Sequence, residues 1–330
     1  MCTAISFQTK DHYFGRNLDL EFSYKETITI TPRNYSLSFS EAKTLRNHYA
    51  LIGVATVADN YPLYYDAVNE KGLCAAALNF PGNAVYHPTL DGADNISPFE
   101  LIPWILGQCQ SVAEAEALLN KANPVNIPFS DEYPLTPLHW IISDAIGSIV
   151  AEPMTNGFAI YKNPVGVLTN NPPFAYHMHN LNNYLNVTAQ EAVNRFSDKW
   201  ELNPYSRGMG GIGLPGDLSS ASRFVRAAFV KLNSVCEDDE ISSVNQFFHI
   251  LGSVEQQRGC AQVGDDYEIT VYSSCCNTSK GIYYYKTYDN SSICAVSLFR
   301  ENLNGESLVS YPLRKSGSIL FEDQQAGRRT

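Results

Sequence analysis

The cysteine at position 2 is the residue of this sequence whose place in the chain could do chemistry. If the initiator Met1 is removed, Cys2 becomes the amino terminus and carries an α-amine and a thiol on one residue. In unperturbed peptides an α-amine titrates near ~8 and a thiol near ~8.5, so the thiol proton can pass to the amine at little free-energy cost. Cys2 would then be a nucleophile that carries its own base.

Position alone does not make Cys2 a catalyst, because a cysteine in second place is more often an accident of sequence. A lipid-modified cysteine is excluded, since no apolar segment precedes it. We expect no leader beyond Met1. The residues that follow decide between the two interpretations.

The first twenty residues predict a β-hairpin. Residues 3–7 alternate between apolar and polar with a period of two, and residues 13–19 do so again after the polar turn at 10–12. A loop at 10–12 would place Cys2 opposite Leu20 in the paired strands.

The returning strand brings charged groups to Cys2. Asp19 lies beside the expected partner of Cys2, so an acid would stand near the new ammonium group. Arg16 lies farther along but has a long side chain, and a fixed cation near the sulfur would favour the thiolate. The hairpin therefore supports the catalytic interpretation of Cys2.

Five short motifs, taken as a set and in their order along the chain, resemble a known family. They are Met1-Cys2-Thr3, Phe14-Gly15-Arg16-Asn17 with Asp19, Asn79-Phe80-Pro81, Leu168-Thr169-Asn170-Asn171-Pro172, and Leu214-Pro215-Gly216-Asp217 with Ser222-Arg223-Phe224. The set resembles the choloylglycine hydrolases, which comprise bile salt hydrolases and penicillin V acylases, over residues 2–311. The likeness is greatest to bile salt hydrolases of Gram-positive gut bacteria.

The resemblance implies a fold and a set of catalytic residues. The fold is that of the N-terminal nucleophile hydrolases, an α+β four-layer αββα sandwich of two stacked antiparallel sheets, and Cys2 is exposed by removal of Met1 alone. In the implied site, Cys2 is the nucleophile, Asp19 is the carboxylate that holds the α-ammonium, and Arg16 is the cation for the thiolate. The backbone N–H of Asn79 and the side chain of Asn170 are the two oxyanion donors, and Arg223 is a supporting cation.

Without the resemblance, Asn79 and Arg223 have ordinary alternatives, and the pattern around Asn170 says only how its side chain is presented. Asn79 ends a predicted strand before Pro81, and the pattern alone favours a turn asparagine. Asn170 precedes Asn171-Pro172, so its backbone must be extended and its side-chain amide is expected to be free to donate. Arg223 falls in the first turn of a predicted helix, where a cation opposes the macrodipole; a solvated surface arginine is the alternative.

The substrate pocket is predicted by resemblance more than by pattern. A steroid needs a broad apolar pocket with few polar anchors. The segment 206–208 resembles the loop of glycine-preferring members, although the choice between glycine and taurine conjugates stays open. The candidate pocket residues are Phe22, Tyr24, Ala67, Phe129, Leu135, Ser206 and Arg207.

Composition limits the class of partner. The chain has 330 residues, 44% of them hydrophobic, and a net charge of −11. Clustered Lys and Arg are absent, which argues against nucleic acid and anionic membrane surfaces. No apolar run approaches the length of a membrane span. We expect one domain over residues 1–330, a cytoplasmic location with reduced cysteines, no cofactor, and a disordered tail at 316–330.

Two other motifs point to weaker alternatives. His177-x-His179 and the pair Cys275-Cys276 lack a second pair at zinc-site spacing, so no metal is expected. The glycine-rich segment 205–216 lacks the Gly-Lys-Ser/Thr of a phosphate loop and is interpreted as an active-site loop.

The remaining pattern predicts strands, then helices, then strands again, which is typical of α+β proteins. Predicted strands lie at 27–31, 49–58, 63–68, 73–79, 139–144, 148–152, 158–161, 166–169, 268–274, 281–287 and 292–299, and predicted helices at 98–109, 111–121, after 219–220, and at 242–254.

The function predicted from these residues is hydrolysis of the amide bond of glycine- or taurine-conjugated bile acids, with acyl transfer to other amines as a side activity. The alternative enzyme is a penicillin V acylase. That family often carries tyrosine at the position of Asn79 when penicillin V is preferred, so asparagine favours bile salts. A non-catalytic ligand-binding or thiol redox protein is the alternative from another class. The resemblance further implies a homotetramer.

Overall fold

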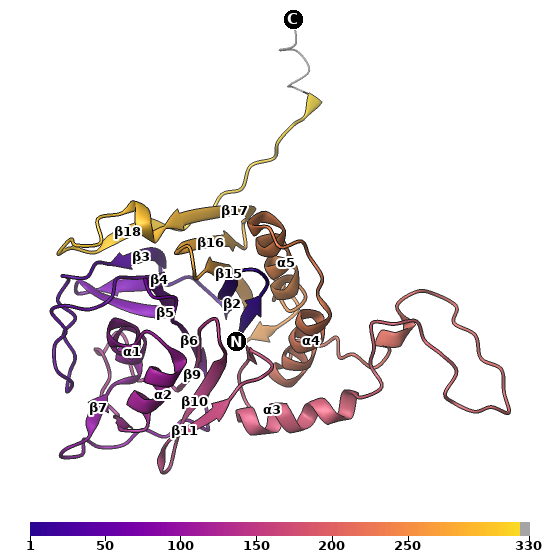
Figure 1. Ribbon diagram of the computed structural model, residues 1–330, viewed down its shortest axis with the longest axis horizontal. Coiled ribbons are helices and arrows are strands. Elements are labelled where there is room, and N and C mark those ends of the chain that lie inside the picture. The colour runs from indigo at the N-terminus through magenta and orange to yellow at the C-terminus, as the bar shows by residue number, and fades with distance from the viewer. Residues whose placement is uncertain (324–330) are drawn as a thin grey trace, which may run out of the picture.

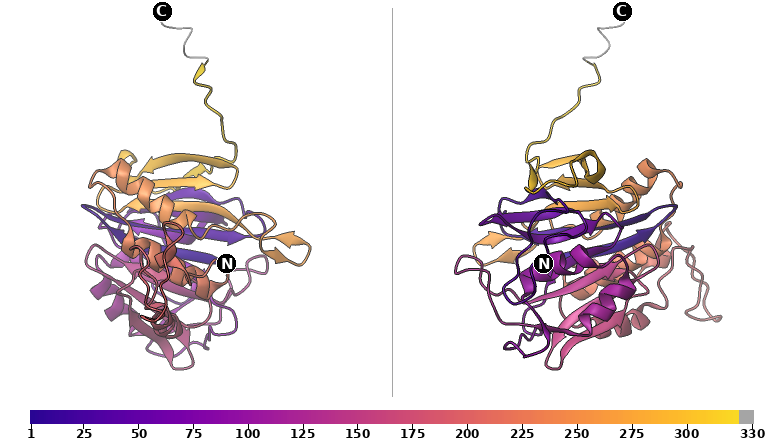
Figure 2. Two further views of the ribbon diagram at one scale, coloured as in Figure 1. Left: turned by 90° about the vertical axis from the view of Figure 1, so that its right-hand side faces the viewer. Right: turned by 60° about the vertical axis from the view of Figure 1, so that its left-hand side comes forward.

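A computed structural model describes residues 1–323 of the chain. Two antiparallel β-sheets lie face to face at its centre, and helices cover the outer face of each sheet (Figures 1 and 2). The predicted α+β sandwich with layers in the order αββα is therefore confirmed.

The first sheet contains the N-terminal strand in its interior. Its six strands have the order β12-β1-β2-β15-β16-β17, so β1 is paired on both sides. Helices α4 (Ser220–Asn233) and α5 (Glu240–Gly252) pack on its outer face. The strands are β1 (Cys2–Gln8), β2 (His12–Leu20), β12 (Val167–Leu168), β15 (Ile269–Asn277), β16 (Ile282–Thr287) and β17 (Asn290–Ser297).

The second sheet has eight strands in the order β11-β10-β9-β6-β5-β4-β3-β18. Helices α1 (Leu101–Gln108) and α2 (Val112–Leu119) cover its outer face. The strands are β3 (Thr27–Thr31), β4 (Leu51–Ala58), β5 (Tyr61–Asn69), β6 (Cys74–Asn79), β9 (Leu138–Ser143), β10 (Ser148–Met154), β11 (Gly157–Lys162) and β18 (Val309–Pro312).

Short elements connect these layers. A short helix of about two turns, α3, follows two prolines after β12, where the sequence predicted extended backbone and no immediate helix. The predicted tail has no helix or strand over 316–320, and residues 324–330 lie outside the described residues. The short elements are β7 (Asp94–Ile96), η1 (Pro98–Glu100), β8 (Ala122–Pro124), α3 (Phe174–Asn180), η2 (Leu181–Tyr184), η3 (Met209–Gly211), β13 (Gln262–Val263), β14 (Asp266–Tyr267) and η4 (Leu298–Arg300).

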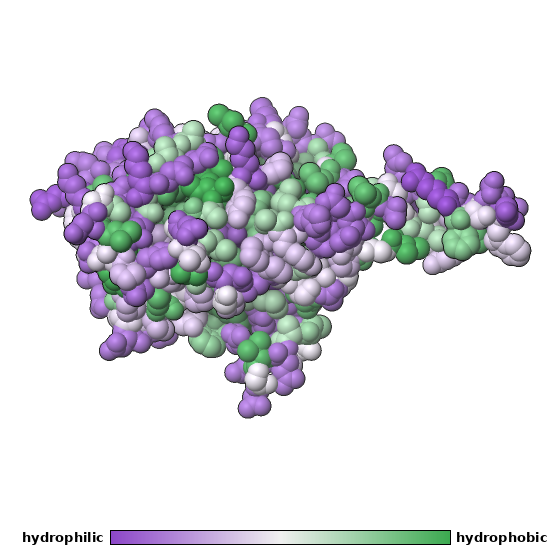
Figure 3. Space-filling view, turned by 90° about the horizontal axis from the view of Figure 1, so that it is seen from below, coloured by the Kyte–Doolittle hydropathy of each residue, from purple (hydrophilic) through white to green (hydrophobic). Residues whose placement is uncertain are grey.

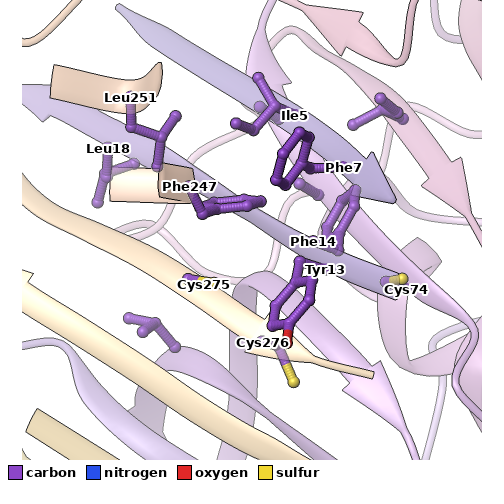
Figure 4. Close-up of a cluster of buried hydrophobic side chains, with 14 of the residues drawn as sticks. Ile5, Phe7, Tyr13, Phe14, Leu18, Cys74, Phe247, Leu251, Cys275 and Cys276 are labelled. Atoms are coloured by element: carbon purple, nitrogen blue, oxygen red, sulfur yellow. The ribbon is translucent and has the colours of Figure 1, made fainter. Parts of the chain in front are cut away.

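The hairpin of β1 and β2 is buried on both faces. Odd-numbered residues face the helices. The Phe7 ring packs edge-on against the Phe247 ring of α5, with the ring centres 6.5 Å apart (Figure 4). The Asn17 side chain donates to Leu251 O. Even-numbered residues face the second sheet, where the Arg16 side chain reaches carbonyl groups of β5 and β6. Each strand of the hairpin is thus packed against the helices on one face and against the second sheet on the other, which explains its nearly continuous burial.

The predicted register of this hairpin is wrong. Cys2 pairs with Leu18 and not with Leu20, and the last pair is Gln8 with His12. His12 is inside the ladder because its ring bonds the side chains of neighbouring strands, so the loop occupies 9–11. A loop one residue earlier shifts every pair by two. Asp19 consequently lies opposite Met1, whose carbonyl accepts its N–H at 3.0 Å.

The hairpin also approaches β15 closely at a glycine. A Cβ on Gly15 would lie 2.0 Å from Ser274 O, which no backbone shift of a few tenths of an ångström relieves. Glycine at this position is therefore a packing requirement of the sheet, directly beside Arg16.

We predict that Gly15→Ala lowers the free energy of unfolding by about 3 kcal/mol or more, because the new methyl group collides with the backbone of β15. Equilibrium denaturant unfolding measures this change. Gly147→Ala is the matched control: a Cβ there meets no atom within 4 Å, and a change of about 0.5 kcal/mol at most is expected. Equal stability of the two variants would contradict the close approach.

Candidate active site

The side chain and the backbone nitrogen of Cys2 have different neighbours. The side chain belongs to the even-numbered face of β1, which it shares with Arg16 and Leu18, and borders a cavity between the sheets. The backbone nitrogen lies 2.8 Å from the Asn170 carboxamide oxygen. Met1 is in place, so this nitrogen is an amide here and would become the α-amine once Met1 is removed.

Arg16 occupies an opening in the second sheet. Its Nη1 donates to Tyr65 O at 3.0 Å and to Ala77 O at 2.5 Å. The ladder between β5 and β6 ends at the pair of Asp66 and Ala76, and the register of β5 with β4 shifts at the same place. The guanidinium group thus binds the backbone carbonyl groups where the next hydrogen-bonded pair between β5 and β6 would otherwise form. This fixes Arg16 beside the cavity without a carboxylate in direct contact.

The charge of Arg16 is balanced by a buried acid that the sequence reasoning missed. Asp66 accepts hydrogen bonds from Tyr272 at 2.6 Å, from Tyr283, and from Ser274 at 3.2 Å. Burial raises the pKa of Asp66, while Arg16 and these donors oppose the rise. An acid within the apolar run of β5 was the available signal.

One nitrogen of Arg16 is free. Within residues 1–323 its Nη2 is buried and has no hydrogen-bond partner. Burial disfavours the charge of Arg16, but nearby Cys2, Tyr272 and Asp66 raise its pKa overall, so the group stays cationic. An unpaired cationic N–H beside the Cys2 side chain suits a thiolate or another anion.

Asn170 joins the nucleophile to Asn79. Its Oδ1 accepts from the Cys2 nitrogen and from Arg223 Nη2, both at 2.8 Å, and neither of these groups can accept. The amide orientation is therefore fixed, and Nδ2 donates to Asn79 O at 2.8 Å. The expected free amide is thus engaged through one N–H, and the second remains for a ligand.

Arg223 is fully buried, so the surface alternative is wrong. From the first turn of α4 it donates to Cys2 O, to Thr3 Oγ1 at 2.7 Å and to Leu218 O at 2.9 Å, besides Asn170. The charge that opposes the helix macrodipole therefore clamps the first residues of β1.

Two acids flank the amino terminus. Asp19 is buried on the helix-facing side, where Oδ1 accepts from Thr270 at 2.6 Å, and Oδ2 has no partner within the described chain. Burial raises the pKa of Asp19, and Arg223 and the terminal ammonium group oppose this. The ammonium group of Met1 donates to Asp19 O at 2.7 Å and pairs with Glu268, a second acid that the sequence reasoning missed.

The cavity beside Cys2 has a volume of about 430 Å³. Of the predicted pocket residues, Tyr24, Phe129 and Leu135 line it. Phe22 stands outside the lining, 56% exposed, with its ring 4.9 Å from that of Tyr24. Packing of Phe129 against Phe99 at 5.2 Å holds the segment before β9 as one wall.

Three predicted pocket residues lie elsewhere. Ala67 follows Asp66, which faces the first sheet, so Ala67 points the other way and is buried against the helices that cover β5. Ser206 and Arg207 are exposed on residues 185–217, which we call the arm. The arm stands away from the body between α3 and α4 (Figure 1), and neither residue lines the cavity of its own chain.

Residues 1–323 present neither a metal-binding cluster nor a membrane-spanning helix. No group of three or more His, Cys, Asp or Glu side chains in this range is placed to hold a metal ion. His177 is buried against Asn170, and Cys275 and Cys276 lie inside β15. In the same range no helix has the length and apolar character needed to cross a bilayer.

The chain was then compared with known proteins. Residues 2–311 match the family described as linear amide C–N hydrolases, choloylglycine hydrolase family. A bile salt hydrolase/transferase of Lactiplantibacillus plantarum is 58% identical, over 95% of this chain and 97% of that protein.

Two solved structures have the same fold. The C2A mutant of conjugated bile acid hydrolase from Clostridium perfringens has a TM-score of 0.90 and 38% identity, with 98% of this chain and 100% of that chain covered. Penicillin V acylase from Agrobacterium tumefaciens has a TM-score of 0.72 at 20% identity, with 96% and 95% covered, which shows the fold alone.

Proposed function

This chain belongs to the choloylglycine hydrolase family of linear amide C–N hydrolases, and from that premise we propose that it hydrolyses bile acids conjugated to glycine or taurine. The proposal rests chiefly on the arrangement at Cys2. Its side chain borders an apolar cavity beside Arg16, and its nitrogen is held by the side chain of Asn170.

In the proposed reaction, the first proton transfer occurs within Cys2. Once Met1 is removed, the α-amine takes the thiol proton, and the thiolate attacks the amide carbonyl carbon. Asp19 Oδ2, which has no partner within the described residues, is the group we assign to the resulting ammonium. Arg16 Nη2 is assigned to the thiolate. The ammonium then gives its proton to the departing amine, which leaves as glycine or taurine.

The negative charge that develops on the carbonyl oxygen needs two donors. We assign these to the second N–H of Asn170 Nδ2 and to the backbone N–H of Asn79, which lies beyond the last rung between β5 and β6. Such a donor is commonly worth about 3 kcal/mol in the transition state. Arg223 keeps Asn170 in place. Water then attacks the Cys2 thioester and releases the free bile acid.

The cavity fits a large apolar acyl group better than a charged one. Its volume is in the usual range for small-molecule sites, and half of its lining residues are leucine or aromatic. Glu21 and Glu132 border it, and among the described residues that line it Arg16 is the only one whose side chain has a fixed positive charge. We therefore propose that the steroid occupies the cavity and that the charged amino-acid end lies toward Cys2 and solvent.

We predict that the purified protein lacks Met1 and releases glycine from glycocholate. Cys2→Ala should lower the rate of this release by at least about 10⁴-fold, because the variant has no thiol to attack the carbonyl and so cannot form the thioester that expels the amine. Intact-mass analysis and amino-acid release measure the two results. Cys74→Ala is the matched control, since this buried cysteine lies in β6 away from the cavity lining.

Other outcomes of the same assay select the alternatives. Turnover of penicillin V without turnover of glycocholate would replace the bile-salt proposal by penicillin V acylase activity. Retention of Met1 with hydrolysis of neither amide would contradict the mechanism and favour a non-catalytic or redox role for Cys2. Added amines that yield new conjugates would establish acyl transfer, since any amine that reaches the thioester competes with water.

We also propose that the chain forms a homotetramer through the arm. The arm exposes apolar side chains, and Figure 3 shows it standing apart from the body with hydrophobic and hydrophilic residues mixed. Exposed apolar residues of this number are typical of a protein interface. In such an assembly Ser206 and Arg207 would contact another copy. The exposed apolar residues are Leu185, Val193, Phe196, Trp200, Leu202, Tyr205 and Ile212.

We expect replacement of both Phe196 and Trp200 by serine to convert the tetramer to smaller species, because their burial between copies would be lost. Size-exclusion chromatography with light scattering measures the mass. Ile146→Ser is the control, because Ile146 is 95% exposed on a turn of the body. A wild type that is already monomeric, or an unchanged tetramer in the double variant, would contradict the interface.

A cytoplasmic location is proposed on the reduced state of the cysteines. All eight are free, and five of them are buried. Cell fractionation with a thiol-labelling step tests this, and recovery of the protein outside the cell membrane would contradict it. The single-domain assignment stays a prediction.

A further inference from the structure

The backbone around Asn170 is held by two buried histidines from different layers. His177, on α3, places Nε2 2.8 Å from Asn170 O, and His139, on β9, places Nε2 2.9 Å from Thr169 O. Both rings are completely buried. Because a carbonyl oxygen can only accept, each Nε2 must carry a hydrogen, which fixes both tautomers.

The His177 ring is neutral. Its Nδ1 has no partner within the described residues, and one face stacks on Phe224 at 4.7 Å. Burial lowers the pKa of His177 to about 4, so protonation would place an unpaired N–H in the core. His177 is therefore a donor of fixed direction over the working range of most enzymes.

The second histidine connects the same segment to the start of α3. His139 Nδ1 lies 3.3 Å from Glu152 Oε1, and this oxygen also accepts from the backbone of Phe174 at 2.8 Å. Glu152 thus anchors the first residue of the helix that carries His177.

From these contacts we propose that His177 is a positioning residue for the hydrolysis of the amide, acting through Asn170. This rests on the proposed function, because it requires Asn170 to bind the oxyanion. The Asn170 N–H is held by Ser220 Oγ at 2.8 Å and its carbonyl by His177. With both backbone groups fixed, the side chain spans from the Cys2 nitrogen to Asn79.

The hydrogen bond between His177 and Asn170 O determines where the Asn170 side chain places its amide group. Asn170 Nδ2 must direct one hydrogen at Asn79 O and the other toward the cavity, which leaves little tolerance in the backbone. If His177 is lost, Asn170 O becomes a buried acceptor without a donor, and the peptide group can rotate to find one. A displacement near 1 Å at such a site costs about 100-fold in rate.

The test compares His177→Gln with His177→Asn. The glutamine amide nitrogen can take the place of Nε2, whereas that of asparagine falls near Nδ1, too far from Asn170 O. We expect His177→Gln to keep kcat within about threefold of wild type and His177→Asn to lower kcat about tenfold or more, with KM nearly unchanged. His179→Asn, at an exposed position of the same helix, is the control and should have wild-type kcat.

Repeating the change in an Asn170→Ala background separates positioning from general stability. If His177 acts through Asn170, His177→Asn should lower the residual kcat less than about twofold in that background. An equal loss in both backgrounds, equal losses for glutamine and asparagine, or an effect on KM alone would overturn the proposal. If His177→Asn does not fold, a crystal structure of His177→Gln decides: an amide bonded to Asn170 O supports the proposal, and its absence at wild-type kcat overturns it.

All rates are measured on the amide that the wild type hydrolyses in a Cys2-dependent manner. Failure of the bile-salt proposal is therefore visible in the wild type, before any His177 variant is compared. A loss confined to the His177 variants concerns Asn170 alone.

Discussion

The structure depends on the hydrogen bonds of two buried arginines, one on each face of the N-terminal hairpin. Arg16 points between the sheets and takes carbonyl groups that the ladder between β5 and β6 leaves open. Arg223 lies on the helix side and holds Cys2 O and Thr3. Neither cation is solvated, so each requires fixed acceptors and a nearby acid. The strand that begins with Cys2 is held between them, so the positions of its thiol and of its nitrogen are both fixed.

The surrounding architecture follows from the need to balance these charges away from water. Asp66 is held by two tyrosines from β15 and β16 on the Arg16 side, and Asp19 is held by Thr270 on the Arg223 side. The supporting hydroxyl groups all come from the C-terminal meander, by which we mean the consecutive antiparallel strands β15, β16 and β17. Its first strand, β15, pairs with β2 in the middle of the sheet. A chain that lacked the meander would leave both acids without donors. The last strands are therefore as important to the amino terminus as its own hairpin.

The groups to which we assign the oxyanion come from separated segments of the chain. Asn79 ends β6, Asn170 follows β12, and Ser220 begins α4, and hydrogen bonds connect all of them. Backbone polar groups at strand ends have no ladder partner, so they are available to bind side chains or a ligand. The histidines at 139 and 177 supply the remaining donors. The edge of the first sheet after β12, the end of β6 and the start of α4 thus meet and form a rigid frame around Cys2.

The sequence by itself determined the nucleophile, the α+β class and most strand positions, because these follow from residue type and from periods that are local in the chain. Cys2, Arg16 and Asp19 were identifiable as candidates within one hairpin, and Asn170 through the resemblance of residues 168–172 to the family. Only the tertiary structure decided the register, which depends on His12 bonding to other strands. It alone directed Ala67 away from the cavity, brought Asp66 to Arg16, and placed Ser206 and Arg207 on the arm. Such facts depend on contacts between residues far apart in sequence, which local patterns do not encode.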